Sequence, residues 1–177
     1  VMSHPDVQLP GRFTPQQAAD LAEIQQRIFF YGWCIDHRRF DDLDGLFLPD
    51  SVIHYDTPGG DQGPWTEMKP WLTRLKVFRC TQHNMHNPIV TFDETGDRAW
   101  STTYGYLMHM QETTDGAKNV MKHSSIYRDA WQRIDGEWRI LKKTLSDVGY
   151  EGIVHFEGVV EYDAPVSGRE LGPRRKT

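Results

Sequence analysis

The sequence predicts an α+β fold, in which N-terminal helices pack on a strongly bent, mostly antiparallel sheet. Residues 14–36 and 65–79 carry apolar side chains at helical spacing, and four long strand-like segments follow from residue 81. Because the helices come first and the strands follow in one run, this order is typical of α+β rather than alternating α/β proteins. A bent sheet around a long helix gives a cone-shaped α+β barrel, whose open mouth is a natural pocket.

The first helix is expected to begin after Thr14, which opens a capping box and precedes a proline at the first helical position. Apolar side chains then recur at spacings of three and four residues, which is the pattern of one helix face. This face contains Leu21, Ile24, Ile28, Tyr31 and Ile35. Asp36 lies at the far end of the same face, where the helix is expected to end.

The segment after this helix mixes short elements with a loop. A short helix is expected at residues 40–47 and a strand at 51–56, followed by a Gly/Pro-rich loop long enough to cover a pocket. Residues 65–79 show helical spacing again, but Pro70 interrupts them. Since proline lacks the backbone N–H that a helix interior needs, we expect this helix to begin at Pro70.

The second half of the chain has the pattern of an antiparallel meander. Turn-forming sequences rich in Gly, Asp and Thr separate four segments in which strand-forming residues dominate. The hairpin signal is strongest at Asp135-Gly136, which apolar residues flank on both sides. The expected strands are residues 81–93, 97–112, 118–134 and 137–147.

A chain of 177 residues is expected to form one domain. The regular patterns lie within residues 14–148, so 1–13 form an N-terminal arm and 149–177 a C-terminal tail rich in Pro, Gly and Arg. The net charge is −5 and no basic stripe follows the chain, so we expect no nucleic-acid partner. We expect no membrane partner either, since no apolar run could span a bilayer and no signal peptide is recognisable.

The two cysteines form no Cys-x-x-Cys pair, so neither a disulfide framework nor a thiolate zinc site is expected. Reduced thiols of this kind are typical of a cytoplasmic protein.

Histidines recur in the expected strands and are candidate acid–base groups. His83, His109 and His123 each lie in a different strand, and imidazole is the side chain that titrates near neutral pH. A carboxylate beside a histidine fixes its tautomer and raises its basicity. If Asp36 and His83 meet in one pocket, His83 would act as a general base; the alternative is an exposed aspartate after the helix and a core histidine that the backbone satisfies.

Strand parity separates the histidines, because side chains alternate between the two faces of a strand. His83 and His86 are expected on opposite faces, which also argues against a His-x-x-His metal pair. Asn87 shares the face of His83 and is a candidate for substrate binding. On the next strand Leu107 and His109 share a face, and both are candidates to line the pocket.

Further polar groups are expected around the same pocket. Ser125, Tyr127 and His123 share one face of their strand, with His123 near the rim. Ser125 and Tyr127 are candidates for substrate binding. The hydroxyl groups of Tyr31 and Tyr55 are candidates to bind a substrate carbonyl group and to stabilise an enolate-like transition state.

Several short motifs occur in an informative order. They are Tyr31…Asp36, Leu46-Phe47 before Pro49-Asp50, Thr81-Gln82-His83, Gly96-Asp97-Arg98-Ala99 and Asp135-Gly136-Glu137-Trp138-Arg139-Ile140. Over about residues 14–148 this set resembles the SnoaL-like branch of the nuclear-transport-factor-2-like superfamily. Within that branch the chain is most similar to the scytalone dehydratases and bile-acid 7α-dehydratases, through Thr81-Gln82-His83, Met108-His109 and His123-Ser124-Ser125.

The resemblance implies a lyase of the dehydratase type that needs no cofactor and acts on a small hydrophobic substrate, aromatic or polycyclic. It implies catalytic roles for Asp36, His83, Tyr31, Tyr55 and His109. The same base would also serve a lyase that releases formaldehyde or an isomerase that shifts a double bond, and the sequence does not separate these reactions.

Other classes of function stay open at this point. One is a non-catalytic ligand-binding or assembly subunit, like the β subunits of ring-hydroxylating dioxygenases. Another is a metal enzyme with His83 and His109 as ligands. An apolar strip at Tyr104 and Tyr106 predicts a homo-oligomer, either dimer or trimer. The sequence assigns no role to His86, His123, Arg128 and Arg133.

Overall fold

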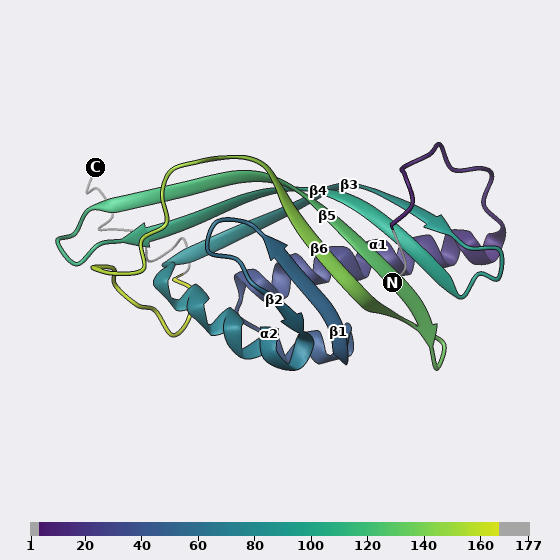
Figure 1. The fold of residues 1–177 in the computed structure, drawn as a ribbon, viewed down its shortest axis with the longest axis horizontal. Coiled ribbons are helices and arrows are strands. Elements are labelled where there is room, and N and C mark those ends of the chain that lie inside the picture. The colour runs from purple at the N-terminus through teal and green to yellow at the C-terminus, as the bar shows by residue number, and fades with distance from the viewer. Residues whose placement is uncertain (1–3, 167–177) are drawn as a thin grey trace, which may run out of the picture.

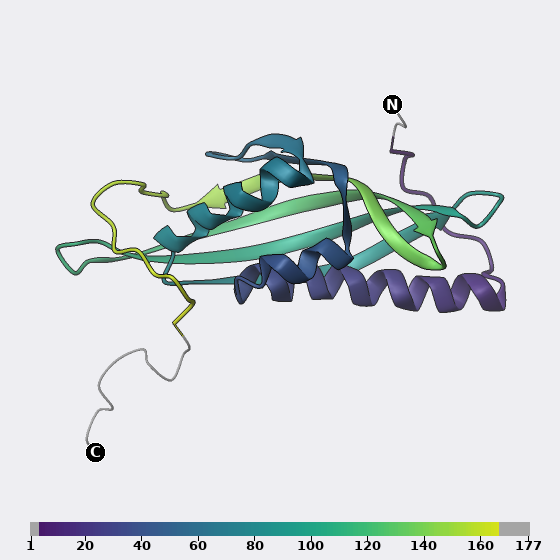
Figure 2. The ribbon, with the colours of Figure 1, turned by 90° about the horizontal axis from the view of Figure 1, so that it is seen from below.

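The computed structural model describes residues 4–166. Residues 1–3 of the expected arm and 167–177 of the expected tail lie outside the described residues. A long helix runs along one side of a bent sheet, with a short helix beside its end (Figure 1, Figure 2). A further helical segment lies across the strands from the long helix in Figure 2. The predicted α+β class, with helices before a bent sheet, is confirmed.

Helix α1 spans Pro15–Asp36 and has the predicted capping box at Thr14. Its buried face carries the predicted apolar residues, and α1 packs along β3. The short helix expected at 40–47 is a 3-10 helix, η1, at Phe40–Gly45, because strand β1 already begins at Phe47.

Helix α2 spans Trp65–Trp71, so the prediction that it begins at Pro70 is wrong. Trp65 and Met68 are buried in the core, and this burial fixes an earlier start. Pro70 is tolerated because it lies in the last turn of α2, which continues as the 3-10 helix η2 at Leu72–Val77.

The sheet has six strands in the order β2-β1-β6-β5-β4-β3 and is open rather than closed into a barrel. Strand β1 pairs with β6 in parallel, and the other pairings are antiparallel. The strands are β1 Phe47–Asp56, β2 Gln62–Pro64, β3 Cys80–Phe92, β4 Arg98–Glu112, β5 Lys118–Ile134 and β6 Glu137–Glu151. The four predicted strands of the meander are confirmed, whereas β2 lies in the loop that the sequence predicted to be irregular.

A bulge in β3 changes the expected parity after His86. Pairing with β4 shifts between His86 and Ile89, and Asn87 adopts a positive φ of 49°. Because the bulge turns the chain, Asn87 is exposed and does not line the cavity described below. Parity does hold for His83 and His86, since His83 faces that cavity and His86 is exposed.

The segment after β6 returns to the body of the protein. Backbone N–H groups of Val160 and Tyr162 donate to the carbonyl oxygens of Glu112 and Lys76, each at 2.8 Å. This segment, the yellow trace in Figure 2, therefore lies against the end of the sheet where β4 and η2 meet.

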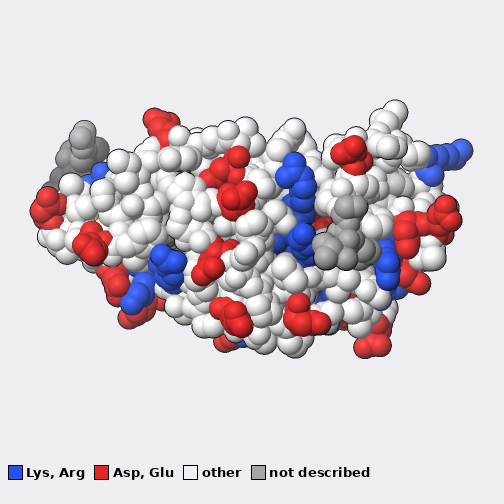
Figure 3. Space-filling view, viewed as in Figure 1, with Lys and Arg blue, Asp and Glu red and all other residues white. Residues whose placement is uncertain are grey.

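The outer surface combines mixed charge with exposed aromatic side chains. Acidic and basic groups are interspersed on the face shown in Figure 3. Tyr104 and Tyr106 on β4 are 55% and 44% exposed, as the sequence suggested, and a homo-oligomer through this strip stays a prediction. Among the helices of residues 4–166, none is both long and apolar enough to cross a bilayer.

Candidate active site

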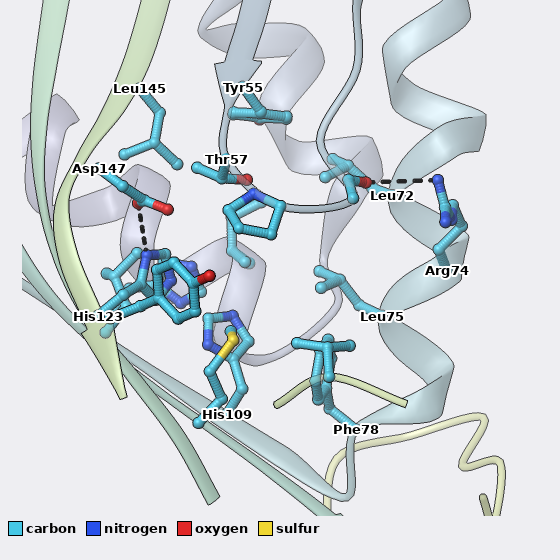
Figure 4. Close-up of a pocket in the computed structure, with 18 of the residues that line it drawn as sticks. Tyr55, Thr57, Leu72, Arg74, Leu75, Phe78, His109, His123, Leu145 and Asp147 are labelled. Carbon is cyan, nitrogen blue, oxygen red and sulfur yellow. Dashed lines mark hydrogen bonds and ion pairs between the residues drawn. The ribbon is translucent and has the colours of Figure 1, made fainter. Parts of the chain in front are cut away.

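A cavity lies between α1, the η2 region and the inner face of β3–β6 (Figure 4). It encloses about 810 Å³, counting the part that is open to solvent. The walls are largely apolar, and a row of three histidines crosses them, one each from β3, β4 and β5. We call His83, His109 and His123 the histidine row. This combination of an apolar pocket with a few polar groups is typical of small-molecule sites.

Asp36 and His83 meet at one end of the histidine row. Asp36 Oδ1 lies 2.6 Å from His83 Nδ1, and Asp36 Oδ2 accepts from the backbone N–H of His83 at 2.8 Å. The hydroxyl group of Thr81 donates to Oδ1 at 2.8 Å. The carboxylate is thus held from three directions at the point where α1 ends beside β3.

The electrostatics of this pair favour an ionised carboxylate. Burial alone would raise the pKa of Asp36, but the hydrogen bonds and charge of His83 outweigh it and hold that pKa below its usual value. An ionised carboxylate only accepts hydrogen bonds, so in the neutral imidazole of His83 the proton is on Nδ1 and Nε2 keeps its lone pair. Nε2 is therefore the nitrogen that can accept a proton from a ligand in the cavity.

Gly32 lets α1 approach β3 closely enough for this contact. A Cβ at Gly32 would lie 3.1 Å from the carbonyl oxygen of His83 and 3.3 Å from its Cβ. Both atoms belong to β3, and pairing of His83 with Leu107 of β4 leaves them little room to move.

We expect Gly32→Ala to push α1 away from β3 and to lengthen the Asp36–His83 contact. Alanine in place of glycine usually raises the free energy of unfolding by about 1 kcal/mol in a helix interior. Here that gain should be absent, because crowding lowers the same free energy by about 1–3 kcal/mol. Urea unfolding and a proton-exchange assay of the type described in the Discussion would measure both effects. A more stable variant with undiminished exchange would contradict this account of Gly32.

His109 lies in the middle of the histidine row. Its ring centroid is 5.4 Å from that of His83 and 5.2 Å from that of His123, and its side chain packs on Phe78. Burial, reinforced by the neighbouring His83 and His123, lowers the pKa of His109 well below its ordinary value. His109 is therefore neutral at neutral pH and lines the cavity as an uncharged group.

The lowered pKa of His109 makes stability depend on pH. In the unfolded chain His109 takes up a proton near pH 6.5, whereas in the folded protein it does so only at lower pH. The unfolded state binds more protons in that window, so stability is full above about pH 6.5 and falls as the pH drops through it. We expect a loss of about 1–2 kcal/mol between about pH 7.5 and about pH 5 from this residue.

Urea unfolding at the two pH values would measure this loss, and His109→Gln should reduce it. The exposed His86 offers a control, since His86→Gln should leave the pH dependence unchanged. An identical pH dependence in His109→Gln and the wild type would contradict the assignment.

The tyrosines form the deep end of the cavity. The hydroxyl groups of Tyr31 and Tyr55 lie 2.8 Å apart, and the ring of Tyr127 meets that of Tyr31 edge to face. Burial raises the pKa values of all three above the ordinary tyrosine value. The hydroxyl groups thus stay protonated and are able to donate a hydrogen bond.

A fully buried ion pair supports these tyrosines from behind. Lys143 Nζ lies 2.9 Å from both carboxylate oxygens of Asp129, and neither side chain is more than 1% exposed. The same ammonium lies 4.2 Å from the ring centroid of Tyr31 and 4.9 Å from that of Tyr127. Nothing in the sequence marked this pair, because a lysine in a strand is usually exposed.

The structure brings most of the predicted site residues together. Those that line the cavity are Tyr31, Tyr55, His83, Leu107, His109 and Tyr127. Asp36 lies behind His83. Ser125 does not line the cavity but contacts His123 and Asp147, and Asn87 lies outside the site because of the bulge in β3. Within residues 4–166, no group of acidic, cysteine or histidine side chains is arranged to hold a metal ion.

Two groups at the cavity were missed from the sequence. Asp147 forms a hydrogen bond with His123 at 2.8 Å, a pairing that the sequence did not indicate. Val154 and Phe156, in the segment after β6, close one side of the cavity. The Gly-rich stretch around residue 152 gave no signal that this segment would fold back.

Known proteins with similar structures share the fold at low sequence identity. A protein from Kribbella flavida aligns with a TM-score of 0.68 at 22% identity, covering 76% of this chain and 95% of that one. A Novosphingobium aromaticivorans protein provisionally named scytalone dehydratase aligns with a TM-score of 0.67 at 17% identity, covering 87% and 100%. A hexachlorocyclohexane dehydrochlorinase, LinA type 2, aligns with a TM-score of 0.65 at 15% identity, covering 84% and 96%.

Sequence comparison gives closer relatives and a family. Uncharacterised proteins of Mycobacterium tuberculosis and Mycobacterium bovis are each 34% identical over 128 residues, which is 72% of this chain and 84% of theirs. Residues 16–144 match the SnoaL-like domain, and this range holds the helices, the histidine row and most of the sheet. The chain therefore belongs to the SnoaL-like domain family.

Proposed function

We propose that this protein is a lyase of the dehydratase type, which uses no cofactor and removes a proton from carbon with the Asp36–His83 pair. The observation that carries the proposal is the 2.6 Å contact between Asp36 and His83 at the wall of an apolar cavity. A histidine so held is suited to accept a proton, and a positioned base typically contributes about 10²–10⁴ to a rate.

The proposed reaction begins at a C–H bond next to a carbonyl group of the substrate. Nε2 of His83 takes the proton, and the electrons of that bond form a carbon–carbon double bond as a hydroxyl group leaves from the adjacent carbon. The leaving oxygen takes up the proton that Nε2 of His83 has just accepted and departs as water, which returns His83 to its starting form. The hydroxyl groups of Tyr31 and Tyr55 are hydrogen-bonded to each other at 2.8 Å, so one of them would donate to the carbonyl oxygen as charge develops on it while the other supports it.

The shape and chemistry of the cavity support an apolar ring-containing substrate. Its walls include Leu75, Phe78, Leu107 and Leu145 beside the histidine row. Two of the similar structures also carry the names of elimination enzymes, a dehydratase and a dehydrochlorinase. An assembly subunit without catalysis would have no need of a carboxylate that positions a histidine at an open cavity.

A panel of hydroxylated bicyclic ketones tests the reaction class. Mass spectrometry after incubation should show loss of water from at least one member with the wild type and not with His83→Gln. Loss of formaldehyde, or an isomer of unchanged mass, would keep the base and replace the dehydratase assignment by the lyase or isomerase alternative. Equal product with both proteins would contradict the proposal.

A further inference from the structure

A second histidine–carboxylate pair lies at the other end of the histidine row. His123 on β5 and Asp147 on β6 approach to 2.8 Å between Nδ1 and Oδ1, and their side chains are only 6% and 14% exposed. The hydroxyl group of Ser125 donates to the same Oδ1 at 2.9 Å and lies 3.0 Å from Nδ1. Pairing of β5 with β6 shifts between Ser124 and Ser125, which places Asp147 opposite Ser125.

This arrangement makes Nε2 of His123 a hydrogen-bond acceptor. A carboxylate can only accept, so Nδ1 of His123 carries the proton and Nε2 keeps its lone pair. Nε2 is buried, and within residues 4–166 it has no hydrogen-bond partner. A buried acceptor without a donor costs free energy, so a ligand that brings a donor to this point gains from satisfying it.

The second pair faces the same space as the first. His123 and Asp147 both line the cavity that His83 lines, and Figure 4 shows Asp147 above His123, joined to it by a dashed line, with His109 nearby. The ring of His109 separates the two ends of the row, with centroid distances of 5.4 Å to His83 and 5.2 Å to His123. A ligand that touches both ends must therefore extend across His109.

We propose that His123, positioned by Asp147 and Ser125, binds a hydroxyl group of the substrate, which donates its hydrogen bond to Nε2. The substrate is then a hydroxylated ring compound that spans the histidine row, with its reactive C–H bond at His83 and a hydroxyl group at His123. The orientation toward His83 rests on the proposed function, whereas the hydroxyl site at His123 stands on its own geometry.

A buried polar group of this kind discriminates between ligands by about the free energy of one hydrogen bond. An analogue that lacks the hydroxyl group leaves Nε2 unsatisfied, and a site built to bind such a group rejects the analogue for that reason. His123 and Asp147 would thus select substrates rather than take part in removing the proton. The apolar walls would accept a wide range of ring shapes between the two ends.

Binding of 2-naphthol and 2-fluoronaphthalene tests the site, because fluorine replaces the hydroxyl group at similar size without a hydrogen to donate. Tryptophan fluorescence can follow both ligands, since Trp71 lines the cavity. We expect the wild type to prefer 2-naphthol by about three- to tenfold, the range of one hydrogen bond. His123→Phe keeps a ring of similar size and should lose this preference while still binding 2-fluoronaphthalene.

His83→Phe is the matched control, because it removes the other end of the row. A preference for 2-naphthol that survives in His83→Phe and disappears in His123→Phe supports the proposal. Loss in His83→Phe alone would place the hydroxyl group at His83, and equal affinities in the wild type, or no binding of 2-naphthol at millimolar concentration, would overturn the proposal.

A measurement on the wild type alone guards against variants that fail to fold. With ¹⁵N-labelled histidine, the Nε2 resonance of His123 should shift on addition of 2-naphthol and not of 2-fluoronaphthalene; no shift would also overturn the proposal. Deuterium exchange into 1-tetralone tests the proposed function separately, since 1-tetralone has no hydroxyl group. Exchange of 1-tetralone without a preference for 2-naphthol would contradict only the hydroxyl site at His123. A preference for 2-naphthol without exchange would contradict only the proposed base, His83.

Discussion

Replacing His83 with glutamine should slow proton exchange at the carbon next to a carbonyl group by about 10²–10⁴, the usual contribution of a general base. Glutamine retains a polar side chain but cannot take a proton. The carbon acid 1-tetralone is a suitable probe, because its exchange in D₂O is visible as the loss of one proton resonance. Asp36→Asn should slow exchange in the same direction, since it removes the negative charge that the imidazolium form of His83 would contact at 2.6 Å.

A nearby histidine provides the control for this experiment. His86 lies on the same strand but is exposed, so His86→Gln should exchange 1-tetralone at the wild-type rate. Asparagine at position 36 has one carbonyl oxygen, which can still accept from the backbone N–H of His83, while its amide group can donate to the hydroxyl oxygen of Thr81, so this variant should fold. Wild-type rates in both His83→Gln and Asp36→Asn would remove the proposed base.

Breaking the buried ion pair should have the largest effect on stability. Lys143→Met leaves the carboxylate of Asp129 fully buried without its partner, and such a change usually costs about 3–5 kcal/mol. Burial already raises the pKa of Asp129, so the variant should hold a protonated carboxyl group. Its loss of stability relative to the wild type should therefore become smaller as the pH falls. Urea unfolding followed by circular dichroism would measure the change.

Two further variants make this prediction specific. Lys143→Met combined with Asp129→Leu should recover most of the loss, because apolar residues often replace a buried ion pair without cost. Lys69→Met removes a surface lysine that contacts the largely exposed Asp41 and Asp44, and it should cost less than about 1 kcal/mol. A similar small loss for Lys143→Met would mean that the buried pair contributes little.

The sequence predicted the elements well where a single local pattern controls them. The capping box at Thr14 and the 3.6-residue stripe set α1, and the alternation between turn signals set β3–β6. It failed at Pro70, where burial of Trp65 and Met68 decides where the helix starts. Local propensity does not report such tertiary packing.

The candidate site was predictable only in part, for a related reason. The Asp36–His83 contact follows from a helix end and a strand position that the sequence marks separately. The prediction placed Asn87 wrongly and did not include the His123–Asp147 pair. Both errors come from strand register. A bulge after His86 and another at Ser124 change which side chains share a face, and neither has a signature in the sequence.

The central claim is that Asp36 makes Nε2 of His83 a base that faces the cavity, and the ¹⁵N NMR spectrum of His83 in its uncharged form tests it most directly. The expected spectrum has a protonated Nδ1 and an unprotonated Nε2, with the Nε2 resonance shifting when 1-tetralone is added and the tautomer preference weakening in Asp36→Asn. A proton on Nε2 in the free wild-type protein, or an Nε2 resonance that ignores the ligand, would contradict the account.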